Sequence, residues 1–349
     1  MTFHDRVDPE CRAPLAAITR LYAAAPWDAD PVLRRRASED QLAAMTAGLP
    51  PVEQVRWQDQ VIPGLPGQPD ATVRSYHPRQ GKEHRPGLLL IHGGGMWGGS
   101  VAHEHQFAAT LCEHLGAVVV SVEYRLAPEH PYPAALLDCY GALVWMSANA
   151  VSLGVDAQRL GVWGGSAGGG LALAVALMAR DQGGPRLCQV MALYPMIDDR
   201  NDTPSARAFG ELGPIWDGAK NAEAWAWYLG GQQPDAYAAP ARAEHLRDLP
   251  PTFIDVGELD VFRDEDIGFA LRLMQAGVPT ELHVYPGAFH ASEFLAPDAA
   301  LSRRIIHTRL EVMHRALHPA APQDALDQAR MAIPAPESTA AHAVLPDTR

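Results

Sequence analysis

Residues 160–168 read Leu-Gly-Val-Trp-Gly-Gly-Ser-Ala-Gly, and apolar residues at helical spacing follow over 171–179. The short apolar run predicts a buried strand that stops at the glycines, so the turn from Gly164 to Gly168 joins a strand to a helix. A G-x-S-x-G sequence in that setting is typical of a nucleophile elbow, whose turn is too tight for flanking side chains. Ser166 is therefore a candidate nucleophile at a helix N-terminus, where backbone N–H groups can meet a developing oxyanion.

A second glycine-rich turn lies upstream, where His92-Gly93-Gly94-Gly95 follows the apolar run 88–91. Its accessible N–H groups are typical of an oxyanion loop. The spacing Gly93-x-Gly95-x-x-Gly98, with Glu123 at the end of the next strand, also fits a dinucleotide-binding fingerprint. However, residues 96–100 predict a loop rather than an immediate helix, and this alternative, a nucleotide-binding oxidoreductase, leaves the serine turn unexplained.

Short apolar strands alternate with helices along most of the chain. Strands are predicted at 88–91, 117–122, 160–163, 190–194, 252–256 and 281–285, and helices at 136–146, 171–179 and about 265–276. This order predicts an α/β fold with a mostly parallel sheet covered on both faces. Residues 10–48 predict two or three short helices, 198–245 resemble an insertion between two strands, and the segment from about 319 predicts a disordered tail.

A nucleophilic serine needs a general base and an acid that orients it, and in this fold they follow the serine as Asp or Glu, then His. Glu258 and Asp260 follow the strand 252–256, whereas Asp264 and Asp266 are better placed to cap the next helix or meet its dipole. His290 follows the strand 281–285 in the loop 286–290, at the carboxyl edge of the sheet where α/β active sites form. His283 alternates within that strand, so its ring is expected to face packing.

Composition excludes several classes of protein. The chain has 349 residues with 47% hydrophobic and 20% charged content, which predicts a packed core, and its net charge of −13 disfavours nucleic acid and anionic membranes as partners. The run Arg34-Arg35-Arg36 is expected to be a solvated helix face, and so are His103, His105 and His114, whose spacing matches no zinc site. Four cysteines without a C-x-x-C pair, no signal peptide and no apolar run of 18 residues predict a cytoplasmic protein with reduced thiols and no metal.

These motifs together resemble the bacterial esterases of the hormone-sensitive-lipase group within the α/β-hydrolases, over about residues 85 to 310. Besides the two glycine-rich turns, the resemblance rests on the following runs: Tyr124-Arg125-Leu126-Ala127-Pro128-Glu129-His130 with Pro131, Pro133, Ala134 and Asp138; Leu249-Pro250-Pro251; residues 260–265; Gly277-Val278-Pro279; and Tyr285-Pro286-Gly287 with Phe289-His290.

The resemblance implies a role for individual residues and regions. Ser166 would be the nucleophile, His290 the base and Asp260 the orienting acid, and Gly94, Gly95 and Ala167 would supply the oxyanion N–H groups. Residues 1–50 would form N-terminal cap helices, joined by 198–228, over a catalytic domain at 51–318, with 319–349 as the tail. The expected substrate is a small-molecule ester, the expected assembly a possible homodimer, and no cofactor is expected.

Three departures from the family pattern leave the substrate open. Gly165 stands where Asp or Thr is usual, Met96 where an aromatic is usual with Trp97 beside it, and Ala291-Ser292 follow His290 where Gly-Phe is common. Met96, Trp97, Gly165 and Tyr194 are therefore the candidates for the substrate pocket. The predicted reaction is hydrolysis of a short-acyl carboxylic ester through an acyl-enzyme. The same residues are also compatible with an amidase such as an aryl-formamide hydrolase, which uses the same triad, and with a non-catalytic ligand receptor.

Overall fold

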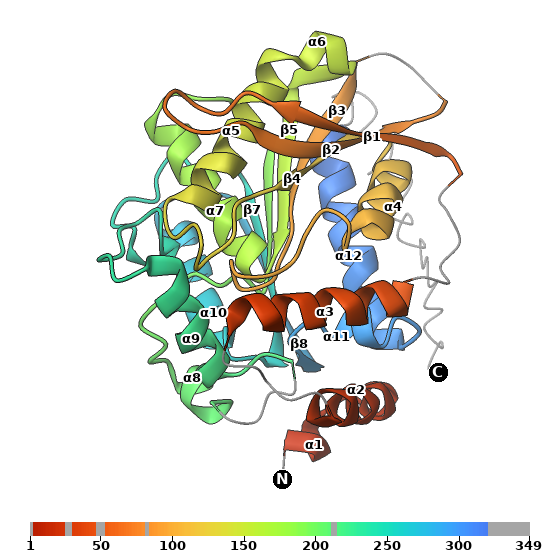
Figure 1. Ribbon diagram of the computed structural model, residues 1–349, viewed down its shortest axis with the longest axis vertical. Coiled ribbons are helices and arrows are strands. Elements are labelled where there is room, and N and C mark those ends of the chain that lie inside the picture. The colour runs from red at the N-terminus through yellow and green to blue at the C-terminus, as the bar shows by residue number, and fades with distance from the viewer. Residues whose placement is uncertain (1–2, 25–29, 47–52, 81–83, 211–214, 320–349) are drawn as a thin grey trace, which may run out of the picture. The chain divides into compact units, whose positions relative to one another are not determined.

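One eight-stranded sheet runs through the protein in the order β1-β2-β4-β3-β5-β6-β7-β8 (Figure 1). The computed structural model describes residues 3–24, 30–46, 53–80, 84–210 and 215–319. The strands are β1 (Val55–Ile62), β2 (Ala71–Pro78), β3 (Arg85–Ile91), β4 (Val118–Glu123), β5 (Val155–Gly165), β6 (Gln189–Leu193), β7 (Thr252–Leu259) and β8 (Thr280–Phe289). Strand β2 runs antiparallel to both of its neighbours, and the pairings from β4 to β8 are parallel.

Helices cover both faces of the sheet, as the alternation of short apolar strands and helices predicts (Figure 1). Successive side chains of a strand point to opposite faces, and in β3 Leu88 and Leu90 pack into one core while Leu89 and Ile91 pack into the other. The first core includes residues of α4 (His105–Leu115) and α12 (Ala300–Leu317). The second includes residues of α5 (Ala134–Ala148), α7 (Ala167–Asp181) and α10 (Arg263–Gln275).

The remaining helices lie near the N-terminus, in the insertion between β6 and β7, or in short connections, and several of them add buried residues to the second core. The N-terminal ones are α1 (Phe3–Arg6), the 3₁₀ turn η1 (Pro9–Cys11), α2 (Arg12–Ala24) and α3 (Pro31–Thr46). The insertion between β6 and β7 contains α8 (Pro204–Ala208), α9 (Gly218–Leu229) and η2 (Pro240–Arg242), whereas α6 (Ala150–Leu153) and α11 (Ser292–Leu295) are short connections. The division into cap and catalytic domain stays a prediction, and all but the first residue of the expected tail lies outside the described residues.

The structure differs from the sequence-based prediction at two places in the sheet. The strands β1 and β2 form an antiparallel hairpin that no apolar run announces, because most side chains of β1 are exposed or half-buried. Strand β8 continues to Phe289, so residues 286–289 are strand rather than loop and His290 follows the strand directly. Among the helices that the structure describes, none combines the length and apolar character that crossing a membrane requires.

Candidate active site

The predicted nucleophile stands in a crowded turn between β5 and α7. Ser166 adopts φ 57° and ψ −122°, a strained conformation for a residue with a side chain. A Cβ atom on Gly164 would lie 2.1 Å from the carbonyl oxygen of Gly168, and one on Gly168 would lie 2.1 Å from the carbonyl oxygen of Ile91. Glycine is therefore required at both positions, and the backbone can hold the serine above the end of the strand.

Ser166, His290 and Asp260 form one hydrogen-bonded chain, although β5, β8 and β7 carry them to the site separately. His290 Nε2 lies 3.1 Å from Ser166 Oγ, and His290 Nδ1 lies 2.9 Å from Asp260 Oδ2. Ser166 is 8% exposed, His290 7% and Asp260 1%, so water reaches the serine and the histidine but hardly the acid. The other oxygen of Asp260 accepts from the Phe262 N–H at 3.1 Å, which fixes the carboxylate.

The other acidic candidates have different partners. Glu258 accepts from Arg6 at 2.7 Å and from the Gly287 N–H at 3.0 Å. Asp264 lies in the first turn of α10, as the dipole alternative expected, but it does not cap that helix: its carboxylate accepts from the Ser205 N–H at 2.7 Å, and Ser205 Oγ accepts from the Asp264 N–H at 3.1 Å. Helices α8 and α10 thus cap each other, a long-range pairing that local spacing cannot reveal.

Asp266 does not cap the helix either, because both of its carboxylate oxygens are buried without a hydrogen-bond partner among the described residues. Burial raises the pKa of Asp266 well above its usual range, and the neighbouring carboxyls of Glu265 and Asp260 add to the effect. Burial without a hydrogen-bond partner in the described part of the chain thus favours the neutral form of this carboxyl. The position of Asp266 near the helix N-terminus suggested a charged carboxylate. Its buried surroundings disfavour that charge.

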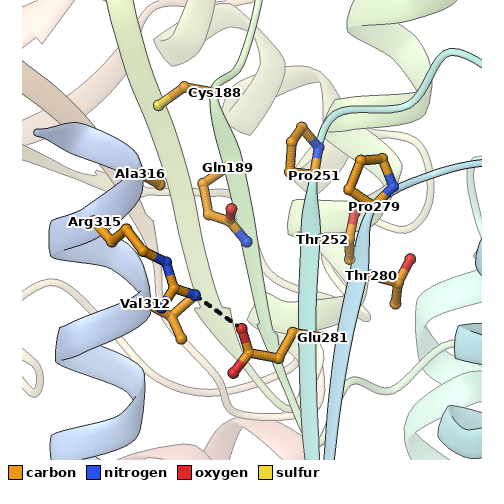
Figure 2. Close-up of a pocket in the computed structure, with 10 residues that line it drawn as sticks. All are labelled: Cys188, Gln189, Pro251, Thr252, Pro279, Thr280, Glu281, Val312, Arg315 and Ala316. Carbon is orange, nitrogen blue, oxygen red and sulfur yellow. Dashed lines mark hydrogen bonds and ion pairs between the residues drawn. The ribbon is translucent and has the colours of Figure 1, made fainter. Parts of the chain in front are cut away.

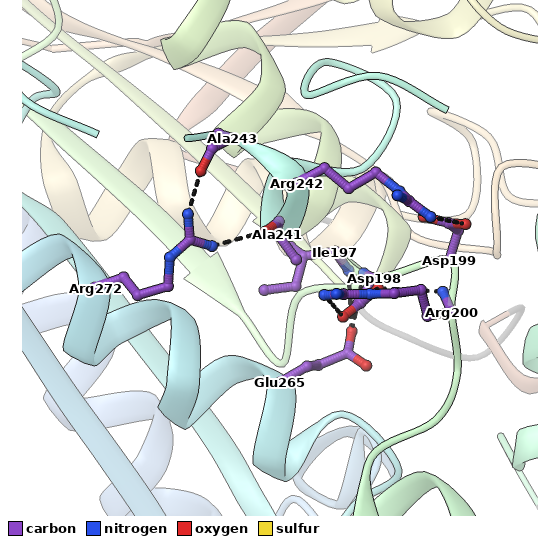
Figure 3. A network of polar contacts seen from close by, with 9 residues as sticks. All are labelled: Ile197, Asp198, Asp199, Arg200, Ala241, Arg242, Ala243, Glu265 and Arg272. Carbon is purple, nitrogen blue, oxygen red and sulfur yellow. Dashed lines mark hydrogen bonds and ion pairs between the residues drawn. The ribbon is translucent and has the colours of Figure 1, made fainter. Parts of the chain in front are cut away.

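Glu265 secures the segment that follows β6, next to the site (Figure 3). Its carboxylate accepts from the backbone N–H groups of Ile197 and Asp198 at 3.2 and 3.3 Å. Asp198 in turn pairs with Arg200 at 2.6 Å, and the N–H of Ala241 donates to the Ile197 carbonyl at 3.1 Å (Figure 3). The start of α10 and the chain beyond β6 are therefore held together on the side of Asp260.

The predicted oxyanion loop packs against the elbow. A Cβ on Gly93 would lie 3.0 Å from the Gly165 carbonyl oxygen and 3.6 Å from Ser166 Cβ. Gly94 and Gly95 have φ of 110° and 60°, and the Gly94 carbonyl accepts from the N–H groups of Trp97 and Gly98. Among the described residues, no protein acceptor takes the N–H of Gly94, Gly95 or Ala167, so these three donors remain available beside the serine.

Two titratable residues, buried His92 and half-buried Glu104, contact this loop. His92 stacks on Tyr124 with ring centroids 4.0 Å apart, and its Nδ1 lies 2.8 Å from the Gly93 carbonyl oxygen. Burial lowers the pKa of His92 to about 4, so the neutral ring donates from Nδ1 at neutral pH. The Gly93 N–H donates to Glu104 at 3.4 Å, and burial raises the pKa of Glu104 to about 7.

Aromatic side chains surround the imidazole and the loop. The ring centroid of His290 lies 4.8 Å from that of Tyr194, 5.4 Å from that of Phe262 and 6.3 Å from that of Trp216. A Cβ on Gly95 would lie 2.5 Å from Trp216 and 2.8 Å from Trp97. Trp216 thus lies beside the candidate site; it belongs to the insertion at 198–245, in which the sequence indicated no individual site residue.

The four pocket candidates differ in their surroundings. Met96 and Trp97 are 1% and 6% exposed, next to the oxyanion loop. Gly165 is half-buried, and a Cβ there would make ordinary contact with Tyr194 at 3.4 Å. Tyr194 is buried, and its hydroxyl donates to Glu293 at 2.8 Å. Their role in binding substrate stays a prediction.

The expectation that Arg34 to Arg36 form a solvated face is wrong for the first two. Arg34 is 4% exposed, pairs with Glu223 of α9 at 2.6 Å and lies 5.0 and 5.6 Å from the rings of Trp227 and Trp97. Arg35 donates to the carbonyl oxygens of Trp97 at 2.6 Å and Ala127 at 2.8 Å, and pairs with Glu129. Helix α3 therefore binds the end of the oxyanion loop, and only Arg36 of the three is exposed.

The dinucleotide alternative receives little support from the geometry. In a dinucleotide site the Glu123 carboxylate would face a ribose, but here it accepts from the Val101 N–H at 2.9 Å. In addition, several turn residues separate Gly98 from α4. In the described part of the chain, no group of three His, Cys, Asp or Glu side chains is arranged to hold a metal ion.

A cavity of about 390 Å³ lies at the amino ends of β6, β7 and β8, where Gln189, Thr252 and Thr280 line it (Figure 2). Arg315 of α12 and Glu281 form an ion pair of 3.1 Å along its wall. The triad residues follow the carboxyl ends of their strands, so this cavity belongs to the opposite edge of the sheet.

Comparison with known proteins agrees with the fold and the motifs. Residues 88–294 match the family model of the α/β hydrolase fold. Esterase LipI of Mycobacterium tuberculosis is 38% identical over 237 residues, which cover 66% of this chain and 73% of that protein. Carboxylesterase NlhH of Mycobacterium tuberculosis is 35% identical over 296 residues, 83% of this chain and 91% of that protein. The solved structure of a bacterial heroin esterase has a TM-score of 0.85 and 38% identity, covering 91% of this chain and 100% of that one. With most of its length matched in sequence and in structure, the chain belongs to the α/β hydrolase fold family, in its hormone-sensitive-lipase-like group.

Proposed function

We propose that this protein is a serine carboxylesterase that hydrolyses short-acyl esters of small molecules through an acyl-enzyme. The observation that carries the proposal is the chain from Ser166 Oγ through both nitrogens of His290 to Asp260, at 3.1 and 2.9 Å, beside three backbone N–H groups that have no acceptor among the described residues. The names of its relatives, esterases and a carboxylesterase, support the same reaction class.

Each residue has a defined task in the proposed reaction. Ser166 Oγ attacks the ester carbonyl while His290 Nε2 takes its proton, and Asp260 accepts the Nδ1–H and stabilises the imidazolium. The N–H groups of Gly94, Gly95 and Ala167 donate hydrogen bonds to the carbonyl oxygen and stabilise the negative charge that develops on it. The imidazolium then returns its proton to the leaving alcohol, and water repeats the sequence on the acyl-enzyme.

The surroundings of the oxyanion loop favour short acyl groups. Trp97 and Trp216 lie within contact distance of the space next to Gly95, so a long chain finds little room there. An apolar pocket gains about 0.8 kcal/mol per methylene only until it is full. We therefore expect the highest kcat/KM for acyl chains of roughly two to eight carbons.

The test combines a substrate series with labelling of the active serine. The protein should hydrolyse p-nitrophenyl acetate and butyrate and react with a fluorophosphonate probe, and Ser166→Ala should lose both reactions while keeping its melting temperature. Ser205→Ala is not a suitable control because Ser205 joins two helices; Ser152→Ala, at an exposed position, is. Normal labelling of folded Ser166→Ala would contradict the assignment, and faster turnover of matched aryl amides than of esters would indicate an amidase instead.

The expected cytoplasmic location and possible homodimer stay predictions.

A further inference from the structure

A buried cluster of charged side chains lies behind the proposed base. Arg309 of α12, Asp255 of β7 and Glu293 of α11 are 3%, 0% and 2% exposed. Arg309 donates to the two oxygens of Asp255 at 2.6 and 3.0 Å and to Glu293 Oε1 at 2.6 Å. One guanidinium therefore ties a strand of the sheet to the short helix that follows His290.

Tyr194 connects this cluster to the triad. Its hydroxyl donates to the same Glu293 oxygen at 2.8 Å, and the guanidinium of Arg309 lies 5.3 Å from the centre of its ring. Its backbone N–H donates to the Asp255 carbonyl oxygen at 2.6 Å. At φ 35° the residue has a left-handed conformation that side chains rarely adopt, so these contacts hold it in place against strain.

The other end of the Tyr194 side chain contacts the reacting groups. Its ring meets that of His290 edge to face, with an interplanar angle of 63° and centroids 4.8 Å apart. The same ring lies beside Gly165, the residue that precedes the nucleophile. Burial raises the pKa of the Tyr194 hydroxyl well above its usual range, so at neutral pH it remains a neutral donor to Glu293.

Net stability is a weak explanation for such a cluster. Removing three charged side chains from water carries a desolvation cost that their mutual attraction offsets only when the geometry is good, and apolar residues of similar volume often stabilise as well. What a fully bonded ionic cluster adds is a single fixed arrangement. The side chain fixed here is one that touches the base.

We propose that Tyr194 is a positioning residue for His290, held at its hydroxyl by Glu293 and through it by Arg309 and Asp255. The proposal rests on the proposed function, since it assigns Tyr194 a task in the same reaction. With its ring against the imidazole, Tyr194 limits the rotation of His290 and keeps Nε2 within hydrogen-bond distance of Ser166 Oγ. Reactions of this kind lose rate steeply when the reacting atoms are misplaced by as little as about 1 Å.

The test removes one oxygen atom and leaves the ring. Arg309→Met leaves two buried carboxylates without their cation and is expected to prevent folding, so Tyr194→Phe is the decisive variant. Its matched control is Tyr237→Phe, which removes another tyrosine hydroxyl bonded to a carboxylate, that of Asp181 at 2.8 Å, outside the site. We expect kcat for p-nitrophenyl butyrate to fall about 10- to 100-fold in Tyr194→Phe with KM changed less than about twofold, and no change in Tyr237→Phe.

Two further measurements separate positioning from stability. Glu293→Leu, which removes the acceptor and leaves Arg309 paired with Asp255, should lower kcat in the same way, and the double variant with Tyr194→Phe should be no slower than the slower single variant, because both act through one hydrogen bond. In proton NMR, the strongly deshielded signal of the hydrogen between His290 Nδ1 and Asp260 should broaden or shift in Tyr194→Phe and not in Tyr237→Phe.

The proposal is overturned if Tyr194→Phe lowers only the melting temperature, with kcat within twofold of the wild type and an unchanged NMR signal. Additive effects of Tyr194→Phe and Glu293→Leu on kcat would also overturn it. If the wild-type protein hydrolyses no ester, the proposed function fails, and the NMR comparison still decides whether Tyr194 positions His290.

Discussion

Asp260→Asn and Asp264→Asn make the same chemical change four residues apart and should impair different properties. The first should lower kcat, and the second should lower stability slightly. Asp260 bonds His290 Nδ1 at 2.9 Å and is 1% exposed, whereas Asp264 bonds the Ser205 N–H and the Arg263 side chain. An asparagine at 260 can turn its amide N–H groups to Nδ1, which moves the imidazole hydrogen to Nε2. The ring then faces Ser166 with a donor and cannot take its proton.

The expected loss for Asp260→Asn is on the order of 10⁴ in kcat, which corresponds to about 5 kcal/mol of transition-state stabilisation. Asp264→Asn keeps an oxygen for the Ser205 N–H and loses only the charge that faces Arg263. Because that ion pair is about a quarter exposed, the cost in unfolding free energy is below about 1 kcal/mol, and the melting temperature falls by about 2 °C or less.

Steady-state hydrolysis of p-nitrophenyl butyrate and a thermal melt of each variant provide the two readings. Glu258→Gln is a third arm, because Glu258 pairs with Arg6 and the Gly287 N–H, and it should lose stability rather than kcat. A kcat of Asp260→Asn within tenfold of the wild type would refute the reasoning. An inactive Glu258→Gln with a normal melting temperature would transfer the orienting role to that residue.

Three further predictions concern the loop and its surroundings. Arg35→Met removes the bonds to the Trp97 and Ala127 carbonyls and should lower kcat about tenfold or more, whereas Arg36→Met, at an exposed position, should leave kcat unchanged; equal effects would exclude a role of α3 in holding the loop. The pKa of Glu104 is about 7 in the folded protein against an ordinary 4.5, so this carboxyl ionises at lower pH in the unfolded chain. Its contribution to the free energy of unfolding therefore falls as pH rises from 4.5 to 7 and then stays level. Glu104→Gln should therefore gain about 3 kcal/mol of unfolding free energy relative to the wild type between pH 4.5 and pH 8 in urea melts, and a constant difference would contradict this. Trp216→Ala should shift the best acyl chain upward by about two carbons or more in a p-nitrophenyl ester series, and an unchanged optimum would show that Trp216 does not limit the acyl site.

The features that local sequence encodes were predictable. The apolar run before the glycines defines a strand, the turn and the following apolar spacing define the elbow, and the order of Ser166, Asp260 and His290 agrees with strands that end at one edge of a parallel sheet. The family resemblance and the fold class are confirmed by the match over residues 88–294. The roles of the three residues themselves stay predictions until variants are measured.

The features that depend on distant partners were not predictable. Arg35 lies 94 residues before Glu129, and Arg309 lies 54 residues after Asp255, so no spacing rule relates them. Arg34 carries the same charge as exposed Arg36, and its burial depends on distant partners such as Trp97, Trp227 and Glu223. Strand β1 was missed because most of its side chains are exposed or half-buried, and β2 was missed because its buried residues alternate with polar ones instead of forming an apolar run.

The crowding around the elbow has a consequence for protein engineering. At positions 164 and 168 a methyl group would already collide with a backbone carbonyl, so randomised codons there would fill a library with unfolded clones. Position 165 is different, because a Cβ there meets only the Tyr194 ring, at 3.4 Å. New substrate ranges are therefore best sought with a small library at 165 and at Trp216, on the two sides of an unaltered serine. Within the turn of five residues from Gly164 to Gly168, positions 164 and 168 must therefore remain glycine, whereas position 165 can be varied.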